Sequence, residues 1–297
     1  MQHLLSIEQL SAGELQRLLE SAAQLKRQRG RDGKPLAGQT WALIFTKSST
    51  RTRVSFEVGI RELGGFPMFL SKNDIQLGRG EPIKDTARVL GRMVGGAVIR
   101  TFAQAEVEEF AHYAGIPIIN ALTDDEHPCQ ILADMFTITE RAGGMDGKVV
   151  TFVGDGACNV AASWIWAAAK LGFELRIAAP RGYQPAPEMI ARAAGRIVVT
   201  EDVQAAARGA DVLYTDVWVS MGKEDEQERR LSDLAGYQVN AGLVQLAGPG
   251  ALVMHCLPAY RGKEIDEATL EANADTIFTQ AENRLHVQKA ILDWMVR

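Results

Sequence analysis

The sequence predicts an α/β protein of two doubly wound domains, each a parallel sheet flanked by helices. Short apolar runs alternate with amphipathic stretches along the chain, which is the pattern of βα units. A glycine-rich segment, GGMDGK at 143–148, interrupts the alternation once before it restarts. The length of 297 residues also suits two domains of roughly 100–200 residues each.

The first half begins with a helix and continues with βα units. Ser11 and Glu14 form a capping box that opens the helix, and the polar segment 28–38 is a loop. Short apolar runs predict buried strands at 40–46, 67–70, 96–102 and 116–122. Stretches with an apolar stripe predict helices at 47–63, 84–94, 106–115 and 127–143.

The second half repeats the alternation. Apolar runs predict strands at 149–155, 174–180, 197–200, 211–218 and 251–258. An apolar helix passes through Trp164 and Trp166, and an amphipathic helix spans 281–297. We expect a first domain of residues 1–140 joined by the helix 281–297, a second domain of residues 141–280, and an active site in the cleft between them.

The composition excludes several classes of protein. A net charge of -5 gives no general attraction to nucleic acid or anionic membranes, so any bound anion must be held by a local cluster of donors. The first residues lack the apolar core of a secretion signal, and no apolar run reaches the ~20 residues that span a bilayer. Three cysteines far apart form neither a disulfide framework nor a zinc ligand set. We expect a cytoplasmic protein with no metal and no organic cofactor.

The most informative segment is STRTR at 49–53, directly after a predicted strand and at the start of a helix. Free backbone N–H groups and the helix dipole attract anions there. The hydroxyls of Ser49, Thr50 and Thr52, with the guanidinium of Arg51, would form a phosphate clamp. The alternative is helix capping with solvated arginines.

Two further βα junctions carry similar groups. Arg100 stands at the end of a predicted strand, where parallel sheets bind ligands, although an arginine there can also form a surface ion pair. His127 and Gln130 lie one helical turn apart and can donate to one carbonyl oxygen, although His127 alone could be a helix cap. Three consecutive junctions with such donors are much less expected by chance than one.

These motifs resemble a known family. STRTR, the Arg100–Thr101 pair and HPCQ-x-LAD are similar to the carbamoyl phosphate site of the aspartate and ornithine carbamoyltransferases. The resemblance covers nearly the whole chain. It implies that residues 49–52 hold the phosphate and that Arg100, His127 and Gln130 bind the carbamoyl end. It also implies that Gln76, within NDIQLGRGEPIKDTARVL, acts across a subunit interface.

In the second half, the motifs resemble those of the ornithine-using members. Asp216, Ser220 and Met221 match the family's DxxxSMG segment, which implies that they bind ornithine together with Asn159. The HCLP motif implies carbamoyl phosphate contacts from Cys256 and Leu257, and Arg284 matches the closing helix that contacts the same substrate. Cys158, where many relatives have asparagine, and Tyr260, where histidine is common, depart from the pattern.

The resemblance implies transfer of the carbamoyl group of carbamoyl phosphate to the side-chain amine of ornithine, giving citrulline and phosphate, in arginine metabolism. Arg51, Arg100 and His127 would stabilise the tetrahedral oxyanion. Either Cys256 or the departing phosphate would take the proton of the amine. The family pattern also implies a trimer or a multiple of trimers, and it leaves open whether the cell makes or consumes citrulline.

The sequence also leaves other functions open. Within the same chemistry, the acceptor could be putrescine, a modified ornithine or aspartate. The chain could also be a catalytically silent member, although the complete set of site residues argues against that. A dehydrogenase is disfavoured because GDGACN at 154–159 lacks the third glycine of a dinucleotide fingerprint.

Overall fold

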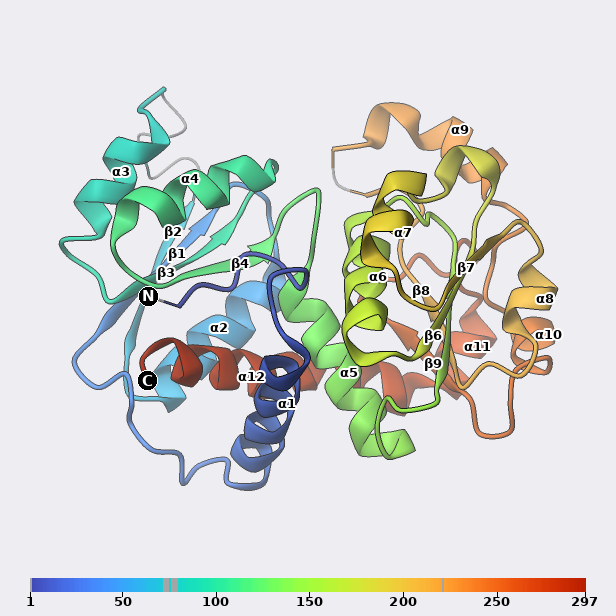
Figure 1. The fold of residues 1–297 in the computed structure, drawn as a ribbon, viewed down its shortest axis with the longest axis horizontal. Helices are drawn as coiled ribbons and strands as arrows, with labels where there is room; N and C mark the ends of the chain where they lie inside the picture. Colours follow the sequence, from blue (N-terminus) through green and yellow to red (C-terminus); the bar gives the residue numbers. More distant parts are fainter. Residues whose placement is uncertain (1, 72–74, 76–79, 221) are drawn as a thin grey trace. The chain divides into compact units, whose positions relative to one another are not determined.

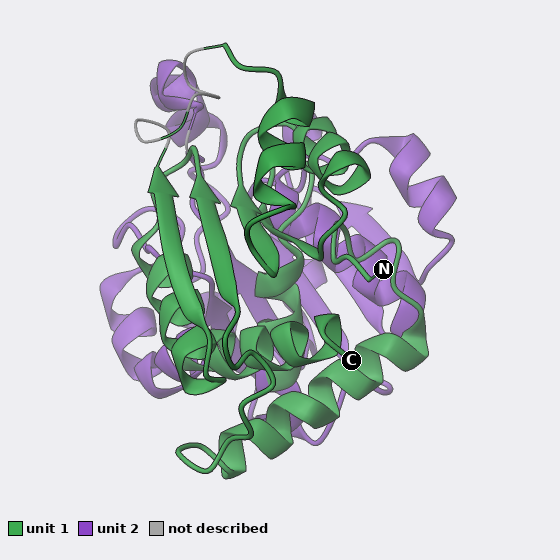
Figure 2. Cartoon of the chain, turned by 90° about the vertical axis from the view of Figure 1, so that its left-hand side faces the viewer, with its two compact units in different colours: residues 1–136, 282–297 green, residues 137–281 purple. Residues whose placement is uncertain are grey.

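The structure, a computed structural model, describes residues 2–71, 75, 80–220 and 222–297. The chain forms two compact units, residues Met1–Phe136 with Glu282–Arg297, and residues Thr137–Ala281 (Figure 2). The boundaries of these units fall within two long helices, α5 (Pro128–Ala142) and α12 (Ala274–Met295). Each unit contains one sheet, and both sheets are parallel, as the sequence predicts.

The first unit contains a four-stranded sheet in the order β2-β1-β3-β4. Figure 1 labels its strands and helices, which are α1 (Ala12–Arg27), β1 (Thr40–Phe45), α2 (Thr50–Glu62), β2 (Phe66–Ser71), α3 (Ile83–Leu90), β3 (Gly96–Arg100), α4 (Gln104–Ala114) and β4 (Ile118–Leu122). The capping box at the start of α1 is confirmed, because the Ser11 hydroxyl accepts from the backbone of Glu14 and the Glu14 carboxylate accepts from the backbone of Ser11.

The strand order of the first unit positions the candidate site. β1 lies between β2 and β3, and β3 pairs with β4, so the carboxyl ends of β1, β3 and β4 share one edge of the sheet. Alternate residues of β1 and β3, such as Ala42 and Ala97, pack with α3 and α4 in one core cluster. The strands that end at this edge are therefore closely packed against helices.

The second unit contains a five-stranded sheet in the order β7-β6-β5-β8-β9. Its remaining elements are β5 (Val149–Val153), α6 (Asn159–Leu171), β6 (Glu174–Ala178), α7 (Pro187–Ala193), β7 (Ile197–Thr200), α8 (Val203–Ala207), β8 (Val212–Thr215), α9 (Gln227–Asp233), α10 (Ala241–Val244), β9 (Leu252–His255) and α11 (Glu267–Ala272). Turns of 3-10 helix occur at Arg181–Tyr183 and Glu224–Glu226.

Helices cover both faces of this second sheet (Figure 1). Phe152 and Tyr214 stack at 5.8 Å between ring centroids, and Trp164 of α6 packs edge-on against Tyr214. The neighbouring residues Val153 and Leu213 point to the other face, where they pack with α8, α10 and α11. This alternation explains why the strands are apolar throughout, and it confirms the doubly wound prediction.

Some elements differ from the sequence prediction. The short helices α7 to α11 were not predicted, because segments of four to seven residues hold too few turns to show a helical period. The helix predicted at 47–63 begins at Thr50, where Ser49 caps it. Among the described residues, no helix is both long enough and apolar enough to cross a membrane.

Candidate active site

The first turn of α2 carries the predicted phosphate clamp. Ser49 is the N-cap, and its side-chain oxygen accepts from the backbone N–H of Thr52 at 3.3 Å. The first turn has no acidic residue that would neutralise the positive end of the helix dipole. The backbone N–H groups of Thr50 and Arg51 therefore lie where an anion is favoured.

The structure distinguishes the two arginines of the STRTR segment. The Arg53 Nε donates to the Glu57 carboxylate at 2.7 Å, and its guanidinium lies 3.6 Å from the centroid of the Phe69 ring. Arg53 is thus engaged along its own helix and against β2. Arg51, two residues earlier in the same turn, makes neither of these contacts and remains the candidate for binding a phosphate.

Arg284 of α12 reaches the same turn of α2. Its guanidinium donates to the Thr52 hydroxyl oxygen at 2.7 Å, and both side chains are buried. A charge-assisted hydrogen bond of this kind fixes the arginine firmly. The structure therefore brings the last helix of the chain to the predicted phosphate clamp, within the first unit.

The ends of β3 and β4 supply the other predicted groups of the first unit. Arg100 is the last residue of β3, and His127 immediately precedes α5; both are buried. The pKa of His127 lies well below 6.5, first because burial disfavours its charged form and then because the cationic Arg284 and Arg100 repel it. His127 is therefore a neutral imidazole at pH 7 beside two guanidinium groups.

Gln130 has a fixed amide. Its Nε2 donates to the Asp134 carboxylate at 2.8 Å, and both residues are buried. Its Oε1 is also buried and has no hydrogen-bond partner among the described residues. Gln130 was predicted as a second donor to a carbonyl oxygen, whereas this geometry leaves its oxygen as an acceptor.

Sequence reasoning missed Lys47, which joins the clamp to the segment before His127. Its ammonium is paired with the Asp124 carboxylate and lies 4.1 Å from the centroid of the Phe102 ring. The lysine is buried although it stands in a loop. A cation two residues before Ser49 was the available signal, but an isolated lysine usually points to water.

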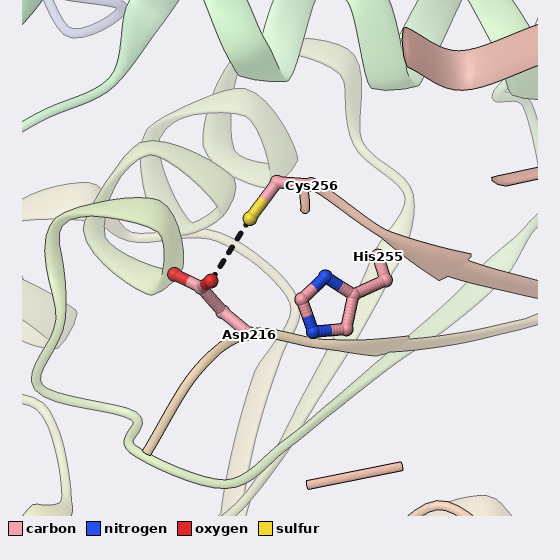
Figure 3. A group of neighbouring side chains, drawn as sticks. All are labelled: Asp216, His255 and Cys256. Carbon is pink, nitrogen blue, oxygen red and sulfur yellow. Dashed lines mark hydrogen bonds between the residues drawn. The ribbon is translucent and has the colours of Figure 1, made fainter. Parts of the chain in front are cut away.

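In the second unit, Asp216 and Cys256 meet at the ends of two paired strands (Figure 3). β8 and β9 pair in register, with Thr215 opposite His255, so the next residue of each strand lies at the same edge. The Cys256 thiol donates to the Asp216 carboxylate, with 2.9 Å between sulfur and oxygen. The side chains of Asp216 and Cys256 are thus in direct contact.

Burial raises the pKa of Asp216 above its ordinary value. Nearby His255, the thiol of Cys256 and the backbone N–H of Val217 lower it, but they do not outweigh burial. The surroundings of Asp216 offset only part of the cost of burying its charge, so a bound cation would stabilise the ionised carboxylate. Asp216 can therefore receive an ammonium group.

His255 supports the segment that carries Cys256. Its Nδ1 accepts from the backbone N–H of Leu257 at 2.8 Å, and its Nε2 lies 3.2 Å from the Glu264 carboxylate. Leu257 has a left-handed backbone with φ of 57°, which turns the chain sharply after Cys256.

Asp216, His255 and Cys256 also offer ligand atoms within 4.8 Å of one another, close enough to share a metal ion. A metal would need a lone pair from the imidazole. The Nδ1 lone pair already accepts from Leu257, and Nε2 faces Glu264. The geometry thus suits hydrogen bonding and proton transfer better than metal binding.

The remaining predicted residues of the second unit are partly described. Asn159 is the first residue of α6, and Ser220 lies in the loop after β8. Met221 in the second unit and Gln76 in the first fall outside the described residues.

The two departures from the family pattern leave these positions intact. Cys158 occupies the N-cap of α6, where its sulfur accepts from the backbone of Ala161 at 3.5 Å, so Asn159 still begins the helix. Its pKa is raised well above the ordinary value by burial and by the nearby Asp155 and Asp216. The ring of Tyr260 is exposed.

Sequence reasoning also missed Arg230, which ties together the loops of the second unit that carry predicted ornithine contacts. Its guanidinium donates to the Asp155 carboxylate at 2.6 Å and to the backbone oxygen of Trp218 at 3.3 Å. Its Nε donates to Glu226 at 2.8 Å. Asp155 precedes Asn159, and Trp218 lies between Asp216 and Ser220, so one buried cation links both segments.

Comparisons with known proteins agree across the whole chain. Residues 2–140 match the model of the aspartate/ornithine carbamoyltransferase carbamoyl-P binding domain, and residues 146–295 match the model of the Asp/Orn binding domain. A relative from Akkermansia muciniphila, an ornithine carbamoyltransferase, is 58% identical over 98% of this chain and 97% of its own. Another, from Campylobacter fetus, is 49% identical over 100% of this chain and 99% of its own.

Solved structures give the same picture. The anabolic ornithine carbamoyltransferase from Campylobacter jejuni superposes with a TM-score of 0.94 at 43% identity, covering 99% of each chain. The ornithine carbamoyltransferase from Pyrococcus furiosus superposes with a TM-score of 0.92 at 44% identity, covering 98% of this chain and 96% of its own. The similarity therefore extends over both units.

Proposed function

The chain belongs to the aspartate/ornithine carbamoyltransferase family, and from that premise we propose how its residues carry out the reaction. The protein is a carbamoyltransferase that moves the carbamoyl group of carbamoyl phosphate to the side-chain amine of ornithine, giving citrulline and phosphate. One observation carries the assignment of the first substrate. Three junctions at one edge of a parallel sheet bring together a helix N-terminus, Arg100 and a neutral His127.

Residues 1–140, with the helix 281–297, form the proposed carbamoyl phosphate domain. The phosphate binds to the first turn of α2 through the backbone N–H groups, the hydroxyls of Ser49, Thr50 and Thr52, and the guanidinium of Arg51. Arg284 adds positive charge and orients the Thr52 hydroxyl. Gln76 completes the site from a neighbouring subunit.

The carbamoyl end lies against Arg100, His127 and Gln130 in this proposal. Neutral His127 donates one N–H to the carbonyl oxygen, and Arg100 stabilises the negative charge that develops on that oxygen in the tetrahedral transition state. The Gln130 oxygen accepts from the carbamoyl NH2 group. The resemblance of the HCLP motif also assigns Cys256 and Leu257 to this substrate.

Residues 141–280 form the proposed ornithine domain. Asp216 binds an ammonium of ornithine, since its buried carboxylate is only partly compensated. Ser220 and Met221 receive the amino-acid head group, and Asn159 at the start of α6 contacts the carboxylate. A half-buried donor at a helix N-terminus suits that negative group.

The attacking amine must lose a proton, because a free alkylammonium has a pKa of about 10.4. Two acceptors are available in the proposal. Cys256, hydrogen-bonded to Asp216, can relay the proton, or the departing phosphate can take it. The effect of replacing Cys256 on turnover distinguishes these routes.

The setting of the reaction also belongs to the proposal. We place the protein in the cytoplasm, in arginine biosynthesis, as a homotrimer or a multiple of trimers. The support is the resemblance of the segment around Gln76 to one that reaches a neighbouring subunit, together with three cysteines that form no disulfide in the structure.

A panel of amines tests the function. Purified protein is mixed with carbamoyl phosphate and, in parallel, with ornithine, putrescine, N-acetylornithine or aspartate, and the ureido product is measured. Citrulline from ornithine alone is the expected result. A product from a different amine would retain the carbamoyl phosphate site and overturn the reading of the 216–222 loop. No product with any amine would indicate a silent family member.

A further inference from the structure

A hydrogen bond joins the side chains of Gln130 and Asp134 in α5. Gln130 and Asp134 lie one turn apart, and they are 1% and 0% exposed. The bond from Gln130 Nε2 to Asp134 Oδ1 measures 2.8 Å. Both side chains are therefore shielded from bulk water.

The two ends of a glutamine amide have nearly the same shape but opposite hydrogen-bonding character. A half-turn of the amide exchanges an acceptor oxygen for a donor NH2 group. A carboxylate oxygen only accepts, so Asp134 favours the orientation with nitrogen toward itself. The Oε1 of Gln130 is then committed to the opposite side.

This oxygen needs a donor. It is buried and has no partner within the described part of the chain, and leaving such a group without a hydrogen bond is unfavourable. His127, one turn earlier at the start of α5, lies beside the two cationic arginines Arg100 and Arg284. The proposed carbamoyl site thus contains N–H donors and one acceptor without a donor.

Carbamoyl phosphate presents both kinds of group at the same carbon, a carbonyl oxygen and an NH2. We infer that Asp134 is a positioning residue that holds the Gln130 amide so that its oxygen selects the carbamoyl NH2 over a group of the same shape without N–H bonds. This inference rests on the proposed function. It deepens that function by naming the residue that sets selectivity at the carbamoyl end.

The magnitude of the expected effect is substantial. A site built to accept from a substrate N–H rejects an isostere that lacks it, because the acceptor is then left buried without a partner. One such hydrogen bond corresponds to about a tenfold difference in affinity. Releasing the amide to turn would remove or reverse that preference.

The test uses two phosphonate analogues of carbamoyl phosphate that have the same size and no charge at the carbonyl end. Phosphonoacetamide carries NH2, and 2-oxopropylphosphonate carries CH3, at the same position beside the carbonyl. Their dissociation constants are measured by calorimetry on the full chain, wild type and Asp134→Asn. Inorganic phosphate is measured in parallel, because it reports on the clamp at residues 49–52 alone.

The wild type is expected to prefer phosphonoacetamide by about tenfold. In Asp134→Asn the new amide can donate to Gln130 Oε1, so the Gln130 amide is free to turn and the preference disappears. Binding of inorganic phosphate stays the same. The control Asp293→Asn removes a carboxylate of α12 that pairs with Arg297, and it keeps the wild-type preference.

A double-mutant cycle shows whether Asp134 acts through Gln130. Gln130→Met removes the acceptor and should itself abolish the preference. Adding Asp134→Asn to Gln130→Met should then change nothing further. Should Asp134→Asn not fold, Asp134→Ser, whose hydroxyl both donates and accepts, is expected to lose the same preference.

The outcomes distinguish a failure of the proposed function from a failure of the inference about Asp134. Wild-type protein that binds neither analogue overturns the proposed function. Wild-type protein that prefers phosphonoacetamide, together with an Asp134→Asn variant that keeps this preference, overturns the inference. The inference is also overturned if Asp134→Asn lowers the preference for phosphonoacetamide equally in the wild type and in Gln130→Met. Asp134 would then act independently of Gln130.

Discussion

Arg230 donates a 2.6 Å hydrogen bond to Asp155, a residue 75 positions earlier in the chain. The two side chains are only 10% and 7% exposed, so both charges are largely removed from water. The same guanidinium also holds the backbone of Trp218 and the carboxylate of Glu226. One cation therefore organises the loops that precede Asn159 and Ser220.

Removing this cation should destabilise the protein. In Arg230→Met the carboxylate of Asp155 stays buried without its partner, and the free energy of unfolding should fall by about 3–5 kcal/mol. The neighbouring Arg229 pairs with the same Glu226 but is 67% exposed, so Arg229→Met should cost less than about 1 kcal/mol. Urea unfolding of both variants measures the difference, and equal losses would contradict this account.

The low pKa of His127 predicts how stability depends on pH. Below about pH 6.5 an unfolded chain binds a proton at this histidine, whereas the folded protein does not. The free energy of unfolding should therefore fall as pH drops from 6.5 toward 5. His3 and His286 also have lowered pKa values, so His127→Gln should make the fall smaller without abolishing it.

Urea unfolding of the wild type and His127→Gln at pH 7.5, 6.0 and 5.5 checks this expectation. The difference between the two proteins should change steadily with pH. A constant difference at all three values would mean that His127 has the same pKa in the folded and unfolded states, which would contradict this account.

Asp216→Asn should raise the stability of the protein and weaken its interaction with ornithine. Burial raises the pKa of this carboxylate, so the stability linked to its neutral form is lost as pH rises through the folded-state value. Asparagine carries no charge at pH 7, and the melting temperature should rise. Ornithine loses its ionic partner, and KM for ornithine should rise at least about tenfold. Unchanged ornithine kinetics would remove Asp216 from the site.

Cys256→Ser separates the two proton routes. If the thiol relays the proton, kcat should fall by about 10²–10⁴ while the dissociation constant of carbamoyl phosphate stays close to that of the wild type. If the departing phosphate takes the proton, kcat should change by much less. Cys129→Ser, which replaces a buried cysteine whose pKa is about 12, is the control for loss of a thiol.

The sequence alone predicted the two parallel sheets, because strands buried on both faces are apolar throughout and end at glycine or polar turns. It also predicted that the STRTR segment begins a helix, since Ser49 is a strong N-cap. Those are local signals. They need no knowledge of which strands become neighbours.

The missed residues depend on long-range contacts instead. Arg230 and Asp155 meet only after β5 and the segment that follows β8, which includes α9, have been brought together. Gln130 was predicted as a donor because its bond to Asp134, which sets the direction of the amide, is not visible in residue types. Short helices such as α10 form because their apolar residues pack against the sheet, and not because of their own periodicity.

The central claim is that the first turn of α2 binds the phosphate of the substrate through Arg51. The most direct measurement is citrulline formation by Arg51→Ala and Arg53→Ala, with circular dichroism to establish that both fold. Arg53 is already engaged by Glu57 and Phe69. We predict that Arg51→Ala loses at least about a hundredfold in turnover, whereas Arg53→Ala retains most of it. Near-normal turnover by Arg51→Ala would contradict the account.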